Sequence, residues 1–477
     1  MTKPSPEEIL PIYQELLPRP KLKALLTEKK IRLYWRMFTP LVVLWLMIFQ
    51  RLNKDHSCDG AVSHIHTGAV DNIDPYDQHD EPLSQRVYSE NSSAYVQGRQ
   101  RLPQMMLTEA LKYLSRVIRG WLGQAEPGKP DLVNSWKGHA VRLMDGTTLR
   151  LPPGGDLVES YGQASNQHGA AYWVIVKVVA VFCLYTQTVV TYAEGHNHTS
   201  ETAFVLALMQ ADDEADSLYV ADINFGIYRV AQVARHCHKY VLLRFKTCVA
   251  EALQRANQKP HLLKPGEECF VSWAPKDTTK VEPGLSTEPI AGRLIYARIE
   301  KKGFRPIDLF LFTTLLDLDI YPAAEICQLY GQRLQVEICL RHVKTSLDME
   351  EFAVKSVAMF RKELAVGLIA YNLICALMVK AGQIASLPPA KLSFCQCCRR
   401  IRDALFYGIP RWVYQHGTAL AHLLQRLAKC KLRHQPNKVR YEPRKVRRRP
   451  AVFPALKGDR NDARRERLNQ ILLEPIS

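Results

Sequence analysis

The sequence predicts an α/β protein built on a mixed β-sheet, and seven consecutive segments carry this prediction. Val-, Tyr- and Thr-rich stretches between Gly-rich or polar turns are typical of strands, whereas apolar residues at intervals of three and four are typical of helices. By these criteria the segments are strands at 140–151, 171–185 and 186–195, a helix at 201–211, a strand at 217–226, a helix at 227–237 and a strand at 239–247. This order, β-β-β-α-β-α-β, is that of the ribonuclease-H-like fold, in which helices cover both faces of a mixed sheet.

Three further regions complete the predicted architecture. Residues 249–320 contain Pro- and Gly-rich turns between strand-like pieces, which predicts a β-rich insertion. A long helix is predicted over 322–347, with Pro322 in its first turn, and a largely apolar helix over 358–381. Residues 1–135, before the sheet, are predicted to be helical.

The composition favours a polyanionic partner. The 477 residues carry a net charge of +17. Residues 428–477 hold 15 Lys and Arg against 5 Asp and Glu, so 15 − 5 = +10 of this charge lies in the tail. A solvated basic end and a phosphate-binding end fit this composition equally well. The length suggests two or three domains.

The cysteine pattern favours free thiols. The twelve cysteines lack the even spacing of a disulfide framework, which fits a reducing cytoplasm. Zinc is disfavoured, because neither the group Cys395, Cys397 and Cys398 nor the pair Cys237 and His238 supplies two well-spaced ligand pairs.

No membrane association is expected. The N-terminus MTKPSPEEIL has no apolar signal region. The longest apolar runs, Leu41–Phe49 and Gly367–Val379, are shorter than the ~20 residues that a membrane span requires. Both runs are therefore predicted to be buried helices.

Two acidic residues stand where a metal site could form. Asp145 lies inside an apolar strand, where a charge is costly unless it is paired or bound to metal, although Asp-Gly is also a strong hairpin signal. Asp222 ends a later strand, where sites gather in open α/β sheets, although helix capping or a loop turn would explain it equally. Mg²⁺ prefers carboxylate oxygens, and pairs of Mg²⁺ ions serve phosphodiester chemistry.

A stripe of polar side chains marks the long predicted helix. At about 100° per residue, five residues fall within an arc of roughly 80°: Tyr330, Arg333, Glu337, Arg341 and Lys344. A solvated face with i,i+4 ion pairs is the usual explanation for such a stripe. A metal site that grips DNA would use the same residues, with Glu for the metal, Arg and Lys for phosphates, and Tyr for stacking or a phosphate hydrogen bond.

The spacing Tyr330-x2-Arg333-x3-Glu337-x6-Lys344 matches the Y-R-E-K signature of a known family. DGTTLRLP resembles the segment around that family's first Asp, and VADINFG the segment around its second. FTPLVVLW and AYVQGRQRLP resemble its N-terminal region, and the Arg-rich tail its C-terminus. Over most of its length the chain therefore resembles the insertion-sequence-four group of bacterial DDE transposases, which also carry a β-rich insertion before the Glu helix.

This resemblance implies a catalytic site. Asp145, Asp222 and Glu337 would be the catalytic residues and the ligands of two Mg²⁺ ions, for which Mn²⁺ can substitute. The family cuts DNA, forms and reopens a hairpin at the element end, and joins the 3′ ends to a target. The partners implied are element-end DNA, target DNA and a second copy of the chain, and the implied location is the nucleoid in a bacterial cytoplasm.

Further residues are expected to contact DNA. The resemblance implies that Tyr330, Arg333 and Lys344 hold the element end, and Arg341 lies on the same face. Trp273 is the candidate for an aromatic that stacks on a flipped base, although a buried Trp in a β-core is the commoner case.

Two positions depart from the family pattern. Ile223 stands where the family usually has Arg directly after the second Asp, and Leu334 where it usually has Trp after the signature Arg. Neither is a metal ligand, so the departures affect efficiency more than identity. The leading prediction is a cut-and-paste DNA transposase. The alternatives are a non-catalytic DNA-binding remnant that occupies element ends, and a metal nuclease of the same fold without strand transfer.

The predicted domain division follows. It comprises a helical N-terminal DNA-binding domain at 1–135, a ribonuclease-H-like catalytic core at 136–248 and 321–385, a β-rich insertion at 249–320, and a helical and basic C-terminal region at 386–477. For residues 1–135, an ordinary helical domain explains the pattern as well as a DNA-binding one.

Overall fold

The computed structural model describes most of the chain. The described residues are 13, 15–27, 37–68, 71, 81–123, 132–166, 169–275, 281–299, 307–409, 418–432 and 458–473. Residues 433–457 and 474–477 of the predicted basic tail lie outside them.

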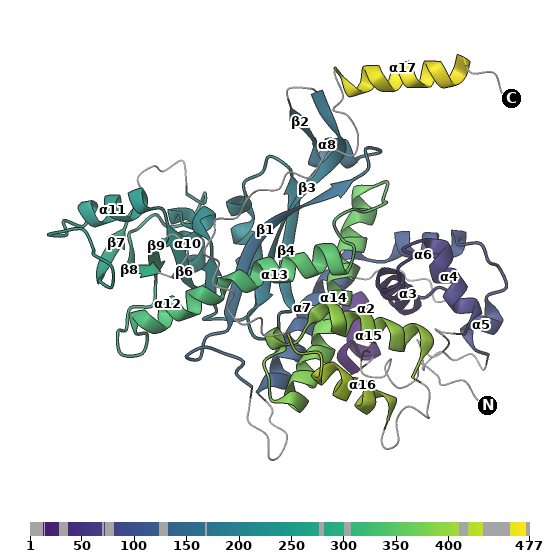
Figure 1. Cartoon of the computed structure of the whole chain (residues 1–477), viewed down its shortest axis with the longest axis horizontal. Helices are drawn as coiled ribbons and strands as arrows, with labels where there is room; N and C mark the ends of the chain where they lie inside the picture. Colours follow the sequence, from purple (N-terminus) through teal and green to yellow (C-terminus); the bar gives the residue numbers. More distant parts are fainter. Residues whose placement is uncertain are drawn as a thin grey trace, which may run out of the picture.

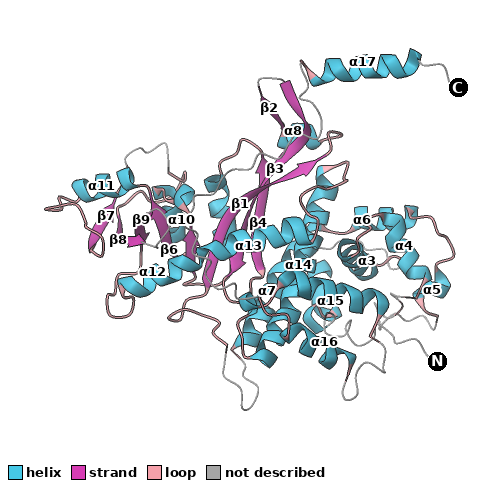
Figure 2. Ribbon diagram, in the orientation of Figure 1, coloured by secondary structure: helices cyan, strands magenta, loops and turns pink. Residues whose placement is uncertain are grey.

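A mixed sheet forms the centre of the described molecule (Figures 1 and 2). Its nine strands are β1 (Val141–Leu151), β2 (Gln163–Asn166), β3 (Gly169–Cys183), β4 (Val189–His196), β5 (Leu218–Ala221), β6 (Tyr240–Phe245), β7 (Glu268–Trp273), β8 (Ile290–Ile299) and β9 (Ile307–Thr313). Their order is β2-β3-β1-β5-β6-β9-β8-β7, and β4 also pairs with β3. β1, β5 and β6 are parallel, whereas β3 is antiparallel to both β1 and β4. The prediction of a mixed α/β fold is confirmed.

Residues 249–320, predicted to be a β-rich insertion, contain three strands. These strands continue the main sheet, because β9 pairs antiparallel with β6 and β8 and β7 follow in turn. The outer edge of β6 would otherwise leave unpaired backbone groups, and β9 satisfies them. The helix α11 (Thr247–Ala256), which precedes β7, was not predicted.

Alternating side chains of the strands divide between two hydrophobic cores. Along β1, Leu143 belongs to one core and its neighbour Met144 to the other. The first core lies under the long helix α14 (Val357–Ala385) and the helices packed with it. The second lies under α9 (Val205–Ala211) and α10 (Tyr228–His236). Helices therefore cover both faces, as period-two burial on the strands requires.

The N-terminal helices pack around α14 rather than apart from the sheet. They are α2 (Arg19–Thr27), α3 (Pro40–Leu52), α4 (Cys58–His66), α5 (Leu83–Arg86), α6 (Ser93–Arg101) and α7 (Gln104–Leu122). Glu363 of α14 forms ion pairs with Arg51 of α3 and Arg99 of α6. α7 lies against both α14 and β4. One hydrophobic core thus joins this region to the sheet.

The C-terminal region is helical where it is described. α15 (Phe394–Tyr407) and α16 (Ala419–Ala428) pack together with α14. α17 (Arg460–Leu473) lies beside the end of the sheet formed by β2 and β3, away from α14 and the helices packed with it (Figure 1). α14 is longer than the apolar run predicted there, and by length and composition it could cross a membrane. However, 94% of its most apolar window is buried inside the protein, which is typical of a core helix.

The long helix predicted over 322–347 is interrupted twice. α12 (Ala323–Gly331) gives way to a 3₁₀ turn, η5 (Gln332–Leu334), then to α13 (Gln335–Arg341) and a π turn, η6 (His342–Ser346). Similarly, the helix predicted over 201–211 begins with a 3₁₀ turn, η2 (Glu201–Phe204). Short 3₁₀ and π segments inside helices often accompany functional sites. The turn η2 contacts the 3₁₀ turn Ile223–Phe225, which follows β5.

Candidate active site

Asp145 lies in the middle of β1. The strand runs without a turn from Val141 to Leu151, so the hairpin interpretation of Asp145-Gly146 is wrong. The Asp145 side chain is 17% exposed, and the Gly146 N–H donates to its Oδ1 at 2.9 Å. A largely buried carboxylate is thereby held in the middle of a central strand.

Asp222 follows the neighbouring strand β5 at the same level of the sheet. Met144 of β1 pairs in parallel register with Ala221 of β5, so the next residue of each strand is acidic. Asp222 also caps the 3₁₀ turn η3 (Ile223–Phe225), because its Oδ1 accepts from the Asn224 N–H at 2.9 Å. The capping interpretation is correct. It occupies one carboxylate oxygen and is compatible with a further role for Asp222.

A third carboxylate, which the sequence did not single out, lies over the backbone of Gly146. It belongs to Glu201, the first residue of η2, just after β4. A β-carbon on Gly146 would lie 2.2 Å from Oε1 of Glu201, so the glycine leaves the space that this carboxylate occupies. The Asp-Gly pair inside an unbroken strand was the signal that could have indicated a close neighbour here.

Arg333 joins this acidic group to the signature helix. Its Nη1 lies 3.7 Å from Oδ2 of Asp145, and its Nη2 forms an ion pair with Glu337. Arg333 is 12% exposed, whereas Glu337 is 49% exposed. The i,i+4 pair expected of a solvated face is therefore present, yet the same guanidinium also faces Asp145.

Tyr330 and the cations beyond Glu337 occupy different environments. Tyr330 is 8% exposed, and its hydroxyl donates to the Ala221 carbonyl at 3.4 Å, directly before Asp222. Arg341 is exposed at the end of α13. Lys344 lies in the π turn, with Nζ 3.8 Å from Oε1 of Glu350.

Negative charge at the site is only partly compensated. Burial raises the pKa of Asp145 to about 6; the Gly146 N–H and Arg333 oppose this rise, and the charges of Asp222 and Glu201 add to it. Burial also raises the pKa of Glu201, which Lys177 opposes and Asp222 reinforces. Burial raises the pKa of Tyr330 to about 12, so its hydroxyl stays protonated near neutral pH. Such uncompensated carboxylates are typical of functional sites.

Trp273 is not part of this site. Its ring is 8% exposed and packs edge-on against Tyr228, Phe245 and Phe312. Its ring contributes to the second hydrophobic core, as is common for a Trp in a β-core, and stacking on a DNA base stays a prediction. Successive side chains of a β-strand point to opposite faces of the sheet, and Trp273 points toward the core.

The two positions that depart from the family pattern lie close to the site. Ile223 follows Asp222 in η3 and is half-buried. Leu334 lies in η5 next to Arg333 and is 59% exposed. An exposed leucine at this position gains little from packing.

The donor set fits a hard divalent cation without forming a closed cage. Asp145 and Asp222 offer carboxylate oxygens from adjacent rigid strands, and their mutual repulsion is what a cation would relieve. Among the residues that the structure describes, no three His, Cys, Asp or Glu side chains lie close enough to bind one ion as they stand. Glu337 is instead paired with Arg333. A third ligand therefore requires a side-chain movement.

Comparisons with known proteins point to one family. The family model for the transposase DDE domain matches residues 136–373, which run from just before β1 into α14. The transposase InsG for insertion sequence element IS4, from Escherichia coli (strain K12), is 25% identical over 322 residues, which are 66% of this chain and 67% of that protein. A cryo-EM structure of the piggyBac transposase synaptic complex with hairpin DNA gives a TM-score of 0.38 at 10% identity, covering 91% of this chain and 86% of that one.

A strand-borne acidic pair in a mixed sheet, within a segment that matches the DDE domain model, defines the class of protein. The chain belongs to the DDE transposases. Within them it is a transposase of the insertion-sequence-four type, carrying that group's Y-R-E-K spacing at Tyr330, Arg333, Glu337 and Lys344. Transposases bind DNA, and members of the DDE family generally use divalent metal ions.

Proposed function

We propose that this chain moves an insertion sequence by a cut-and-paste mechanism, in which it cleaves phosphodiester bonds at the element ends and joins them to target DNA. The observation that carries the proposal is the pairing of β1 with β5, which brings Asp145 and Asp222 together as uncompensated carboxylates. Membership of the family supports nuclease or transposase activity in general. We assign this activity to the site around Asp145 and Asp222.

Asp145, Asp222 and Glu337 would hold two Mg²⁺ ions, or Mn²⁺ in their place. When bound, such ions activate an attacking hydroxyl and stabilise the leaving oxygen. In this structure Glu337 is engaged by Arg333. A DNA phosphate that takes over the guanidinium would free Glu337 to turn toward the two aspartates.

Arg333 is suited to receive that phosphate. Its Nη1 is buried and makes no hydrogen bond with any residue that the structure describes. A guanidinium binds phosphate oxygens strongly through paired N–H groups. Tyr330, Arg341 and Lys344 would orient the same DNA strand, with Tyr330 fixed by its bond to the Ala221 carbonyl.

The catalytic core is proposed to be ribonuclease-H-like. The supporting feature is the strand order β4-β3-β1-β5-β6, with an antiparallel first half and a parallel second half. We also propose that residues 1–135 bind DNA, that residues 249–320 are an insertion into the core, and that residues 386–477 form a basic C-terminal region. Two element ends must be brought together, which supports a homodimer in the DNA complex on the bacterial nucleoid, in the cytoplasm.

A second candidate is a non-catalytic protein that binds element ends. The observations that favour it are the Arg333–Glu337 pair, which leaves no three-carboxylate cluster in the described residues, and the exposed Leu334. Such a protein would bind end DNA and never cut it. A nuclease without strand transfer would cut and never join.

The test uses purified full-length chain, Mg²⁺ and linear DNA that carries the terminal inverted repeats flanking its coding region. Nicked, hairpin and target-joined products are expected with the natural chain. Asp145→Asn should reduce their formation by at least about 10²–10³-fold, because it removes charge from the reacting centre. Asp308→Asn, an exposed change on β9, is the matched control and should leave products unchanged.

Bound but uncut DNA from the natural chain would overturn the proposal in favour of the binding protein. Cut but unjoined DNA would favour the nuclease. Omitting Mg²⁺ should abolish both steps and leave DNA binding, measured by gel shift, in place.

A further inference from the structure

The strand beyond β5 carries a cation at the level of the two aspartates. In the parallel pairing of β5 with β6, Ala221 lies opposite Leu243, so the next residues, Asp222 and Arg244, are also level with each other. The parallel pairing of β1 with β5 places Asp145 at that level too. Three adjacent strands therefore present an acid, an acid and an arginine in one row.

The three side chains of this row lie on one face of the sheet. Two residues before each of them, Leu143, Val220 and Leu242 all belong to the first hydrophobic core, on the α14 side. Residues two apart in an extended strand point to the same face, and the backbone of Asp222 is still extended. The signature segment covers this face, because Tyr330 belongs to the same core.

Tyr330 lies close to all the charged groups of the row. Its hydroxyl donates to the carbonyl directly before Asp222, at 3.4 Å. Burial raises the pKa of Tyr330 to about 12, and the charges of Arg333 and Arg244 oppose this rise. The charges of Asp222 and Asp145 reinforce it. Two guanidinium groups and two carboxylates thus surround one phenol.

Arg244 has donors that no residue of the described chain uses. It is half-buried, and its Nε is buried without a hydrogen bond to any described residue. No acidic side chain in the described ranges forms an ion pair with its guanidinium. A cation on the apolar face of a strand is costly unless an anion joins it. Nη1 of Arg333 is likewise buried without a hydrogen bond, so unfilled donors lie on both sides of the aspartates.

We propose that Arg244 binds a phosphate of the element-end DNA, on the opposite side of the cleavage point from the phosphate that Arg333 binds. The inference rests on the proposed function, in which Asp145 and Asp222 mark the cleavage point. The distance from β1 to β6 is two strand spacings, roughly 10 Å. One DNA strand carries a phosphate about every 3.4 Å along its axis, so this distance spans about three phosphates. The two guanidiniums can therefore hold one DNA strand across the row, with the bond to be cut between them.

The test measures binding of the full-length chain to linear element-end DNA by fluorescence anisotropy, in EDTA so that no cleavage follows. Arg244→Gln should raise the dissociation constant about tenfold, because a charged hydrogen bond to phosphate is lost. It should also reduce the slope of log affinity against log salt concentration by about 0.9, the value for one phosphate contact. Arg244→Lys keeps the charge without the paired N–H groups, so the slope should stay and the affinity should fall about threefold.

Arg116→Gln is the matched control. Arg116 lies on α7 and pairs with Asp213, which precedes β5 and so lies at the end of the sheet opposite Asp222. This change removes the same charge away from the site, and it should alter neither the affinity nor the salt slope. Circular dichroism and melting temperature identify any variant whose folding has changed.

A second measurement locates the phosphate. A neutral methylphosphonate replaces one DNA phosphate at a time on each side of the cleavage point. At the phosphate that Arg244 binds, this replacement should weaken binding by the natural chain but not by Arg244→Gln, since both changes remove the same contact. The same comparison with Arg333→Gln should identify a phosphate on the other side.

The outcomes separate this inference from the function on which it rests. If the natural chain binds element-end DNA no better than unrelated DNA of equal length, the proposed function fails, and this inference fails with it. If the ends are bound specifically but Arg244→Gln keeps the affinity and the slope, only the role of Arg244 is overturned. Weaker binding with no phosphate coupled to Arg244, or with its phosphate on the same side as that of Arg333, would also contradict it.

Discussion

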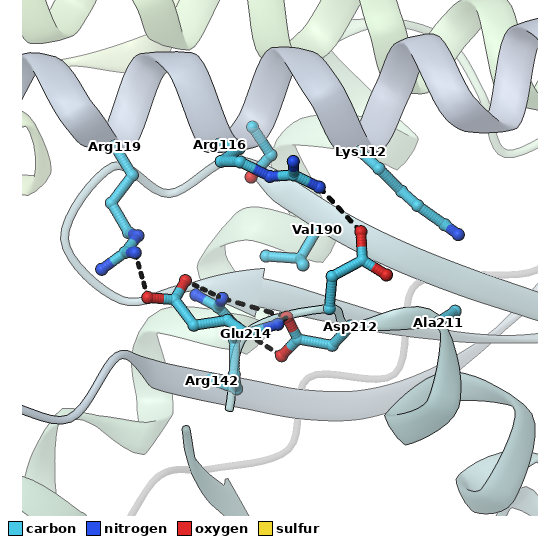
Figure 3. A pocket seen from close by; sticks show the side chains of 10 residues that line it. Lys112, Arg116, Arg119, Arg142, Val190, Ala211, Asp212 and Glu214 are labelled. Atoms are coloured by element: carbon cyan, nitrogen blue, oxygen red, sulfur yellow. Dashed lines mark hydrogen bonds and ion pairs between the residues drawn. The ribbon is translucent and has the colours of Figure 1, made fainter. Parts of the chain in front are cut away.

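At its first residues β1 carries a buried Arg142, and three residues later it carries Asp145. Arg142 is 4% exposed and donates to both oxygens of Asp212, at 2.8 and 3.2 Å, and to Glu214 at 3.0 Å. Asp212 also accepts from Ser217 and Tyr219. Figure 3 shows Arg116 and Arg119 of α7 extending toward this acidic turn, where Arg119 pairs with Glu214. Every charge in this network has an opposite partner.

The site around Asp145 also contains acids and an arginine, but its negative charge is only partly compensated. Burial alone would raise the pKa of Asp212, yet Arg142 and its hydrogen bonds lower it below the ordinary value. Burial raises the pKa of Asp145 to about 6, and Arg333, which also pairs with Glu337, opposes this rise only in part. Asp212, which follows α9, and Asp145, which lies within β1, thus differ in the sign of their pKa shift. A buried acid whose charge is compensated by arginines stabilises the fold. A buried acid whose charge is not compensated is a candidate for ligand binding.

The largest expected effect comes from breaking the compensated network. Arg142→Met should lower the free energy of unfolding by about 3–5 kcal/mol, because it leaves Asp212 buried without its main counter-charge. Urea unfolding followed by circular dichroism measures this. Arg150→Met is the control on the same strand: Arg150 is 46% exposed and pairs with Glu351, so its loss should cost less than about 1 kcal/mol.

The double variant Arg142→Met, Asp212→Leu sharpens this result. Removing both partners of a buried pair should recover most of the lost stability, since the cost lies in the uncompensated charge. An equal loss from Arg142→Met and Arg150→Met would show that the network does not hold the fold.

The second-largest expected effect is a gain rather than a loss in the free energy of unfolding, and it depends on pH. In EDTA, Asp145→Asn should stabilise the fold by about 1–2 kcal/mol at pH 7. The folded pKa of about 6 lies above the ordinary 3.8, so between these values the folded chain binds more protons and loses stability as pH rises. Asparagine resembles the protonated acid, so the advantage should shrink toward zero near pH 4. Thermal unfolding from pH 4 to pH 8 measures it.

Added Mg²⁺ should make the natural chain more stable than Asp145→Asn. The natural chain should gain melting temperature as Mg²⁺ is raised at pH 7, because a ligand that binds only the folded state stabilises it, and Asp145→Asn should not. A stabilisation by Asp145→Asn that is equal at pH 4 and pH 8 would contradict the assignment of uncompensated charge to Asp145.

Sequence patterns could predict the pairing of the two aspartates, but not their neighbours. The strand order makes β1 and β5 adjacent and parallel, so Asp145 and Asp222 meet whatever the loops do. The position of Glu201 could not be predicted from the sequence. In the sequence it resembles an ordinary acid in the first turn of a helix after Ser200, and its place beside Gly146 depends on the tertiary packing of η2. The Arg142 network was equally hidden, because its partners lie 70 or more residues apart in the chain.

Other differences have similar causes. The stripe of polar residues around Glu337 predicted one continuous α-helix. The structure instead has a 3₁₀ turn at Gln332–Leu334 and a π turn at His342–Ser346. Local periodicity carries no information about such breaks. The strands of the insertion were recognised by composition, but their union with the main sheet depends on the free edge of β6, which no local pattern reports.

The smallest expected effect tests how far compensation extends toward solvent. Arg119 and Glu214 are 20% and 32% exposed, whereas Arg116 and Asp213 are 61% and 59% exposed at 2.7 Å. A double-mutant cycle to alanine should give a coupling energy of about 1 kcal/mol for Arg119–Glu214 and no more than about 0.5 kcal/mol for Arg116–Asp213. In 1 M NaCl, where charges are screened within about 3 Å, the second coupling should vanish and the first should persist in part. A stronger coupling at the exposed pair would mean that burial does not set the strength of this network, and the contrast with the site around Asp145 would then need another cause.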